Sequence, residues 1–212
     1  EKLPNNRYHL YINQPDTTIG DHYRNALRSA CDDKAEAIHF GFIDRILYVL
    51  ETNPEEFKKD INDMKSNGMV VFERSERAWR THPKDYYEAE KMVMDVFEKF
   101  LHRKIDLNFC AITADNKTAS FLLKESSSSS FNTAGEWILE ALSYNIQVRT
   151  KEVDWLDWED PFWEHTDQDT LRNKRECDPV ETLKRYISAQ EFLSLLKAEK
   201  FKKLFLKIFD KT

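Results

Sequence analysis

The sequence has 212 residues, of which 41% are hydrophobic and 33% are charged, and its formal net charge is −6. A chain of this length buries about 70% of its unfolded surface and needs neither disulfides nor a metal to fold. Its 5 Trp, 8 Tyr and 14 Phe exclude a disordered chain. The negative charge excludes a surface that is basic throughout, so nucleic-acid binding would need a local basic patch.

The 3 cysteines lie at scattered positions and suggest no disulfide framework. This pattern favours an intracellular location, cytoplasmic or nuclear, where thiols stay reduced. The sequence has no run of about 20 apolar residues, so we expect no membrane span. It begins at Glu1 rather than at Met, from which we expect either part of a longer protein or a processed chain.

Hydrophobic spacing predicts strands and helices in alternation along the first half of the chain. In chain order we expect a strand at 7–12, a helix at 17–30, a segment at 37–50 that changes from strand to helix, a helix from Pro54, a strand at 69–73 and a helix from Pro83. Asn53 can cap the helix that starts at Pro54, and Gly68 supplies a left-handed stop after it.

The central region predicts a hairpin, a loop, a helix and a strand. Residues 106–114 and 117–125 favour strands and flank a turn signal at Asp115-Asn116, so we expect them to pair antiparallel. Five consecutive serines at 126–130 indicate a flexible loop. Thr133 and Glu136 form a capping box for the helix that follows, and residues 146–153 alternate like a strand.

Apolar stripes on the expected helices define the expected core. Each stripe belongs to a helix with a recognisable start signal, and such a face normally packs against the rest of the domain. We therefore expect six side chains to be largely buried: Phe57, Ile61, Val93, Phe97, Trp137 and Leu142.

The C-terminal third predicts a connection followed by helices. Residues 153–178 carry few secondary-structure signals, whereas Asp178 and Pro179 start helices whose apolar residues repeat at three and four. We expect an α+β fold: a mixed sheet with an antiparallel hairpin, flanking helices and a C-terminal helical extension. The expected parts are an α+β domain (1–153), an acidic aromatic connection (154–178) and basic amphipathic helices (179–212) packed on or beside the domain.

The sequence offers no catalytic, cofactor or metal motif. Its 4 glycines lie far apart, so no loop could cradle phosphates and we expect no ATP- or NAD-dependent activity. Cys and His lack the paired spacing of a zinc site. Asp106, Glu125 and Glu152 lie beside strands and lysines, as the ligands of metal-dependent nucleases do. With 38 acidic residues in the chain, however, such a grouping is common.

Charge is sorted along the C-terminal third. Residues 152–169 contain eight acids and no Lys or Arg, and residues 181–212 contain eight Lys or Arg against four acids. Aromatic rings can anchor in a partner's pocket while charges steer the encounter. The simpler interpretation is that the rings cover the domain itself and the lysines are solvated. The candidate partner-binding residues are Trp155, Trp158, Phe162, Trp163, Lys200, Lys202, Lys203 and Lys207.

These observations lead us to expect a non-catalytic protein-protein interaction module of a larger intracellular assembly. Its partner would be another protein or a second copy of the chain. The alternatives are a nucleic-acid-associated domain that uses the basic C-terminal helix, and a carboxylate-dependent phosphodiester hydrolase. An exposed apolar patch would support the first, a continuous basic face the second, and a cleft with converging titratable groups the third.

Overall fold

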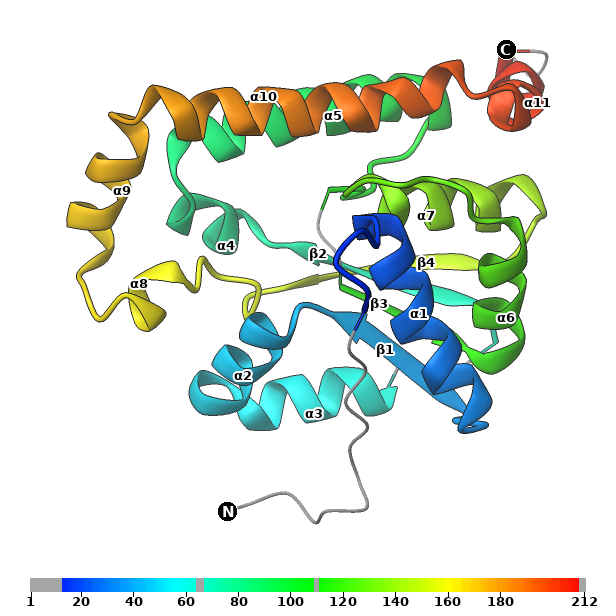
Figure 1. The fold of residues 1–212 in the computed structure, drawn as a ribbon, viewed down its shortest axis with the longest axis horizontal. Coiled ribbons are helices and arrows are strands. Elements are labelled where there is room, and N and C mark those ends of the chain that lie inside the picture. The colour runs from blue at the N-terminus through cyan, green and yellow to red at the C-terminus, as the bar shows by residue number, and fades with distance from the viewer. Residues whose placement is uncertain (1–12, 64–66, 109–110, 210–212) are drawn as a thin grey trace.

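The computed structural model describes residues 13–63, 67–108 and 111–209, without the side chains of 63 and 207–209, and the strand expected at 7–12 lies outside these residues. The predicted α+β fold with a mixed sheet is confirmed (Figure 1). The strands are β1 (Ala37–Gly41), β2 (Met69–Arg74), β3 (Ala111–Asp115) and β4 (Val148–Val153). The helices are α1 (Ile19–Asp32), α2 (Ile43–Thr52), α3 (Pro54–Asp63), α4 (Glu76–Thr81), α5 (Lys84–Leu101), α6 (Asn116–Glu125), α7 (Thr133–Ser143), α8 (Asp160–Trp163), α9 (Gln168–Glu176), α10 (Pro179–Ser194), the 3₁₀ turn η1 (Leu195–Lys197) and α11 (Glu199–Phe209).

The sheet has the strand order β1-β3-β2-β4. β3 pairs antiparallel with β1 and with β2, and β2 pairs parallel with β4. The C-terminal ends of β1, β2 and β4 therefore lie at the same end of the sheet as the first residue of β3. Phe42, Ser75 and Asp154 follow β1, β2 and β4, which run in the same direction, at this end of the sheet. Residues 105–108 approach the same end before β3 begins.

Helices α2 and α3 cover one face of the sheet (Figure 1). Val70 and Phe72 of β2 point to this face because successive side chains of a strand alternate between the two sides. Phe57 of α3 packs there against Trp155, with ring centroids 5.1 Å apart. Trp155 also donates its indole N–H to Asp60 (2.9 Å), so its one polar group has a partner inside the core.

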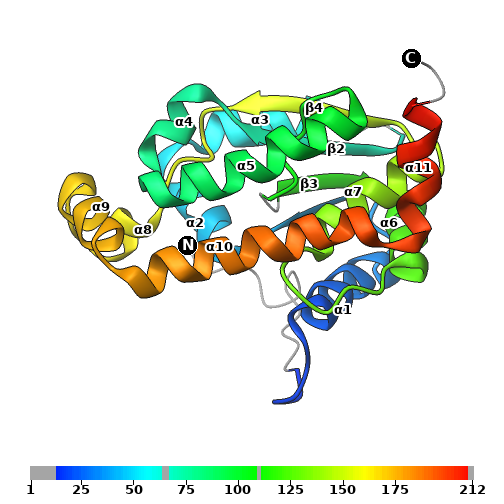
Figure 2. The same cartoon turned by 90° about the horizontal axis from the view of Figure 1, so that it is seen from above.

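The opposite face carries the larger core. Met69 and Val71 of β2 point into it, and α1, α5, α6 and α7 contribute the helical side chains. α10 runs beside α5, and α11 packs against α5 and α7 (Figure 2). Phe201 and Phe205 of α11 belong to this core, so the basic C-terminal helices pack on the sheet domain.

The burial predicted for the helical stripes is confirmed at four of six positions. Phe57, Val93, Phe97 and Trp137 are buried. Ile61 and Leu142 are only partly buried. Both lie near the last turn of their helix and pack against a core cluster with only part of their surface.

The predicted hairpin is wrong in its second arm. Residues 117–125 form α6 instead of a strand, and β3 pairs with two distant strands. The side chain of Asp115 accepts a hydrogen bond from the backbone N–H of Thr118 (2.7 Å) and so caps α6. Aspartate favours both turns and helix N-caps, and for this reason a strand-to-helix junction resembled a turn.

The connection expected at 153–178 contains two short helices, α8 and α9. The side chain of Asp167 caps α9 by accepting a hydrogen bond from the Thr170 N–H (2.9 Å). The expected cap at Asp178 is confirmed, since its side chain accepts from the Val180 N–H at 2.9 Å. Among the described residues, no helix combines the length and the apolarity that crossing a bilayer requires.

Candidate functional site

The acidic aromatic segment divides into a buried half and an exposed half. Trp155 and Trp158 are each 4% exposed. The backbone N–H of Trp158 donates to the hydroxyl of Thr81 (2.8 Å), which ties this stretch to the end of α4. The prediction that these two rings contact a partner needs correction, because they already fill the interior of the protein itself.

Phe162 and Trp163 form the exposed half. Each ring keeps 39% of its surface exposed. The ring of Phe162 contacts Tyr48 of α2 at 5.4 Å and Trp163 at 4.9 Å, edge to face in both cases. Two adjacent aromatic rings on a short helix are therefore partly exposed, and their predicted role in partner binding stays a prediction.

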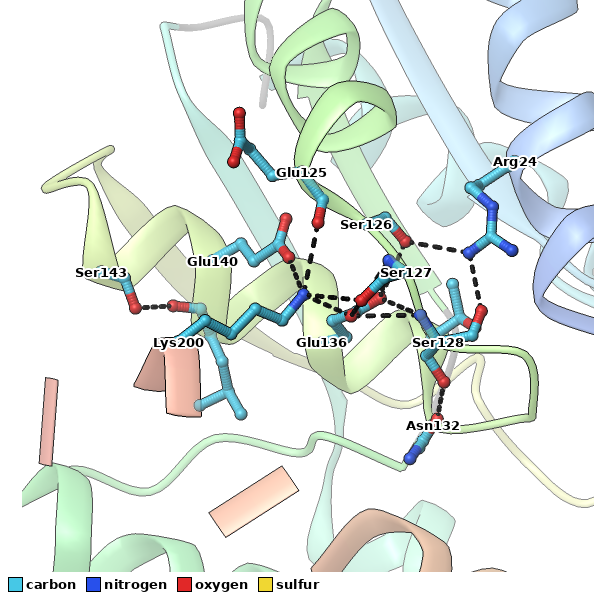
Figure 3. A network of polar contacts seen from close by, with 12 residues as sticks. Arg24, Glu125, Ser126, Ser127, Ser128, Asn132, Glu136, Glu140, Ser143 and Lys200 are labelled. Carbon is cyan, nitrogen blue, oxygen red and sulfur yellow. Dashed lines mark hydrogen bonds and ion pairs between the residues drawn. The ribbon is translucent and has the colours of Figure 1, made fainter. Parts of the chain in front are cut away.

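Lys200 forms an internal ion-pair cluster instead of an open surface charge. Its ammonium contacts the carboxylates of Glu136 (2.5 Å) and Glu140, both only 2% exposed at the side chain, and donates to the carbonyl of Glu125 (3.3 Å) (Figure 3). The predicted role of Lys200 in partner binding is therefore corrected. The single charge of Lys200 is shared between two buried carboxylates, each of which would be costly to ionise alone in this interior.

Glu136 anchors the serine loop to this cluster. Its carboxylate accepts from the backbone N–H groups of Ser127 and Ser128, at 3.1 and 3.0 Å, and from the hydroxyl of Ser126 (Figure 3). The predicted capping box is thus replaced by contacts to the preceding loop. Gly20 of α1 packs so closely on this loop that a Cβ there would lie 2.0 Å from the Ser128 carbonyl oxygen. The five serines are held in place and do not form the free loop that we expected.

Burial and ion pairing act differently on the two carboxylates of the cluster. Burial acts to raise the pKa of Glu136, but hydrogen bonds from Lys200 and from the serine loop outweigh it, and the net pKa is below the ordinary value. Burial raises the pKa of Glu140 to about 7, although Lys200 opposes the shift. Near neutral pH the cluster therefore holds one firmly ionised carboxylate and one that titrates.

Of the remaining predicted lysines, Lys202 and Lys203 are neighbours on α11. Lys202 is 56% exposed at its side chain and pairs with Glu199 within the same helix, and Lys203 is exposed. Lys207 lies in α11, and its side chain is outside the part of the chain that the structure describes.

Asp106, one of the acidic residues beside the sheet, binds arginine. Asp106 is fully buried and accepts two hydrogen bonds from Arg74, at 2.9 and 3.1 Å. Arg74 also pairs with Glu90 (2.6 Å) and stacks on Trp79, with its guanidinium carbon 3.4 Å from the ring centroid. Within the described residues, no group of three or more His, Cys, Asp or Glu could hold a metal ion.

A cavity of about 390 Å³ lies between α2 and α10, at the edge where β1 ends. This volume falls in the usual range for ligand and anchor sites, about 300–1,000 Å³. Aromatic rings from four separate segments contribute to its walls, together with charged and amide groups. The cavity is lined by Tyr23, Phe42, Arg45, Glu90, Asn108, Phe131, Lys184, Arg185, Ile187, Ser188, Glu191 and Phe192.

Several exposed apolar side chains belong to the two helices and the loop that contribute to the walls of this cavity. On α2, Ile43 and Leu47 are 69% and 46% exposed, and on α10, Leu183 and Ile187 are 59% and 49% exposed. Phe131, from the loop before α7, is 47% exposed and lines the cavity itself. We name these five residues the α2–α10 face. Phe131 and Ile187 line the cavity, and Ile43 and Leu183 are neighbours in the sequence of the lining residues Phe42 and Lys184.

Sequence reasoning missed the α2–α10 face, although part of its signal was present. Residues 43–50 are apolar nearly all round the helix, a pattern typical of helices that are buried on every side. The positions of α10 that face outward, Val180, Leu183 and Ile187, are apolar at helical spacing as well. No periodicity indicates that α2 and α10, more than 120 residues apart, border one cavity.

Comparison with known proteins gives no functional guide: no protein-family model matches the sequence, and no curated protein matches it.

Proposed function

We propose that the protein is a non-catalytic protein-protein interaction module of a larger intracellular assembly and that it binds its partner through the α2–α10 face. The observation that carries this proposal is the clustering of exposed apolar side chains. Ten of the thirteen large apolar side chains that are exposed in the described part of the chain belong to α2, α8, α10 or the loop before α7: Ile43, Leu47, Leu50, Phe131, Phe162, Trp163, Val180, Leu183, Tyr186 and Ile187.

The physical argument concerns the solvent exposure of these side chains. Single apolar residues on a surface are ordinary, but a contiguous patch around a cavity is typical of an interaction site. Burying apolar surface yields about 25 cal/mol per Å², so a partner that covers several of these side chains gains stability without any charge pair. The cavity beside them gives such a partner a place for an anchoring side chain.

The nucleic-acid alternative receives less support. Of its proposed lysines, Lys200 is committed to Glu136 and Glu140, and Lys202 pairs with Glu199. For the hydrolase alternative, the carboxylate of Asp106 is fully buried and hydrogen-bonded to Arg74, so it is not open to a substrate. The intracellular location, cytoplasmic or nuclear, remains part of the proposal and is supported by cysteines 31 and 177, which are free thiols.

A quantitative capture experiment tests the proposal. The bait is the whole chain in three forms: wild type, the double variant Leu47→Asp/Leu183→Asp, and Leu206→Asp as a matched control. Leu206 is 59% exposed, as Leu183 is, but lies on α11. We expect the double variant to lose specific proteins from a cell lysate that the wild type and the control both retain, as measured by mass spectrometry.

The result that would contradict the proposal is equal capture by all three baits. Circular dichroism and thermal unfolding of each variant, measured beforehand, ensure that a loss of binding is not a loss of fold. Because the substituted side chains are exposed, we expect each change to alter stability by no more than about 0.5 kcal/mol.

A further inference from the structure

Helix α11 is attached to the sheet domain by a small apolar contact. Of its described side chains, Phe201 and Phe205 are the buried ones, and the ring centroid of Phe205 lies 5.5 Å from that of Phe100 on α5. Leu206 is 59% exposed. The sheet does not depend on α11, because its strands pair only with one another. Elements with few buried apolar contacts open more readily than the core strands.

Lys200 supplies a polar attachment of the same helix. Its ammonium contacts the carboxylates of Glu136 and Glu140 on α7 and donates to the Glu125 carbonyl at the end of α6 (3.3 Å) (Figure 3). It also donates to the hydroxyl of Ser127 in the serine loop (3.2 Å). One side chain thus joins α11 to three other segments of the chain.

This cluster has one cation for two carboxylates. Burial acts to lower the pKa of Lys200, but hydrogen bonds to the two carboxylates and their charges outweigh burial, and the net pKa lies above the ordinary value. Lys200 is therefore charged at neutral pH. The cluster would carry an excess negative charge if Glu136 and Glu140 were both ionised. Neighbouring like charges in a buried site disfavour each other, so one of the two carboxylates keeps its proton to a higher pH.

Hydrogen bonding selects Glu140 as the carboxylate that holds the proton. Glu136 accepts from the backbone N–H groups of Ser127 and Ser128, at 3.1 and 3.0 Å, in addition to Lys200. One oxygen of Glu140 contacts Lys200, and the other is buried without a hydrogen-bond partner in the described part of the chain. Donors favour the ionised form of a carboxylate. In agreement with this difference, burial raises the pKa of Glu140 to about 7, whereas the net pKa of Glu136 is below its ordinary value.

Departure of α11 changes the ionisation of Glu140. It withdraws Lys200 and lets water reach the Glu140 side chain, which is 2% exposed while the helix is in place. The pKa of this carboxyl then falls from about 7 toward its ordinary value of 4.5. Opening therefore releases a proton at any pH between these two values, and a rise in pH within this range favours the open form.

We propose that α11 is a pH-sensitive latch, which detaches from α5 and α7 while the sheet stays folded, and that loss of the Glu140 proton promotes this opening. The latch is closed in mildly acidic solution and opens more often as the solution approaches neutral pH. The inference goes beyond the proposed function, because neither α11 nor the Lys200 cluster belongs to the α2–α10 face.

Other titratable groups lie near the latch. Burial has the largest effect on the pKa of Glu140. Of the charged groups, Lys200 lowers this pKa, and Glu136 and Glu125 raise it. The other charged or titratable side chains described on α11, on η1 and at the end of α5 are Glu199, Lys202, Lys203, Lys197, Glu98, Lys99 and His102. Histidine ordinarily titrates between about pH 5 and pH 8, so His102 and Glu125 each need a control variant.

Hydrogen–deuterium exchange of the whole chain, followed by mass spectrometry at about pH 5.5 and about pH 8, tests the proposal. Exchange rates are expressed as protection factors, which remove the intrinsic effect of pH on amide exchange. We expect the protection of α11 to fall about tenfold or more between the two pH values. At each pH we expect the amides of α11 to be at least about tenfold less protected than those of β2, because the helix opens without the sheet.

Variants of the whole chain assign the effect to its group. Glu140→Gln should protect α11 to the same extent at both pH values, because an amide has no proton to lose in this range. Its controls, Glu125→Gln and His102→Gln, should retain the pH dependence of the wild type. Lys200→Met should lower the protection of α11 about tenfold or more at both pH values. Lys202→Met, which removes an exposed lysine of the same helix, should not.

The proposal is overturned if the protection of α11 in the wild type is the same at the two pH values, or if Glu140→Gln retains the wild-type change. It is also overturned if α11 and β2 have equal protection factors, because α11 would then open only when the whole fold unfolds. If Lys200→Met does not fold, the comparison of Glu140→Gln with Glu125→Gln decides the question by itself.

Discussion

Single residues of the same type play different roles in this protein, according to their burial and partners. Lys200 and Lys202 lie two residues apart on α11, yet Lys200 forms ion pairs with two buried carboxylates and Lys202 pairs with Glu199 at the surface. Exposed pairs contribute about 0–1 kcal/mol, whereas removing one member of a buried pair costs about 3–5 kcal/mol. Reversing Lys200 would therefore disturb the fold, and its effect on binding would not report on a contact surface.

Glu140 yields a prediction about pH. Its folded-state pKa is about 7, against an ordinary value of 4.5, because of burial. Between these values the folded state holds a proton that the unfolded state has released, so stability falls as the pH rises from about 4.5 to about 7. In the variant Glu140→Gln, the amide that replaces the carboxyl group cannot titrate. The variant should gain stability relative to the wild type over this range, by up to about 3 kcal/mol.

Urea unfolding at several pH values between 5 and 8 measures this difference. Glu98→Gln, on the exposed side of α5, is the matched control for the change of an acid to an amide. A constant difference between Glu140→Gln and the wild type across the range would show that Glu140 does not titrate within it.

At the scale of elements, capping residues and apolar spacing predicted most helices. They failed where the same residues fit both a strand or turn and a helix. The segment at 37–50 was resolved as β1 followed by α2, and Asp178 caps α10 as its sequence suggests. Residues 117–125 contain Phe121, Leu122 and Leu123 in a run that fits a strand, but as α6 they bury Ala119 and Leu122 against the core. Tertiary packing decides between these two outcomes, and no local rule contains it.

Phe97 tests the helical stripe of α5. It is 1% exposed and lies in the larger core, with Phe205 of α11 at 6.4 Å between ring centroids. Phe97→Ala should lower the free energy of unfolding by about 3–5 kcal/mol, since it removes a buried ring and leaves a cavity. Met92→Ala, at a 40% exposed position of the same helix, is the control. Chemical denaturation measures both, and a loss below about 1 kcal/mol at Phe97 would refute its place in the core.

At the scale of the whole molecule, the candidate site arises from the assembly of distant segments. The sequence predicted contact surfaces in the acidic aromatic segment and on the basic helices. Folding buried Trp155 and Trp158, committed Lys200 to internal carboxylates, and left Phe162 and Trp163 exposed. It also brought α2, α10 and Phe131 around one cavity. The site could not be predicted because its residues share no local pattern and are joined only by the topology of the sheet.

Site-specific photo-crosslinking tests the central claim, that the α2–α10 face is the docking surface, most directly. A benzoylphenylalanine is introduced at Leu183 in one form of the whole chain and at Leu206 in another, two positions that are both 59% exposed. After irradiation in cell lysate, the account predicts discrete crosslinked proteins from position 183 that are absent from position 206. Those bands should disappear when Leu47→Asp is added. Crosslinks of equal pattern and yield from both positions would contradict it.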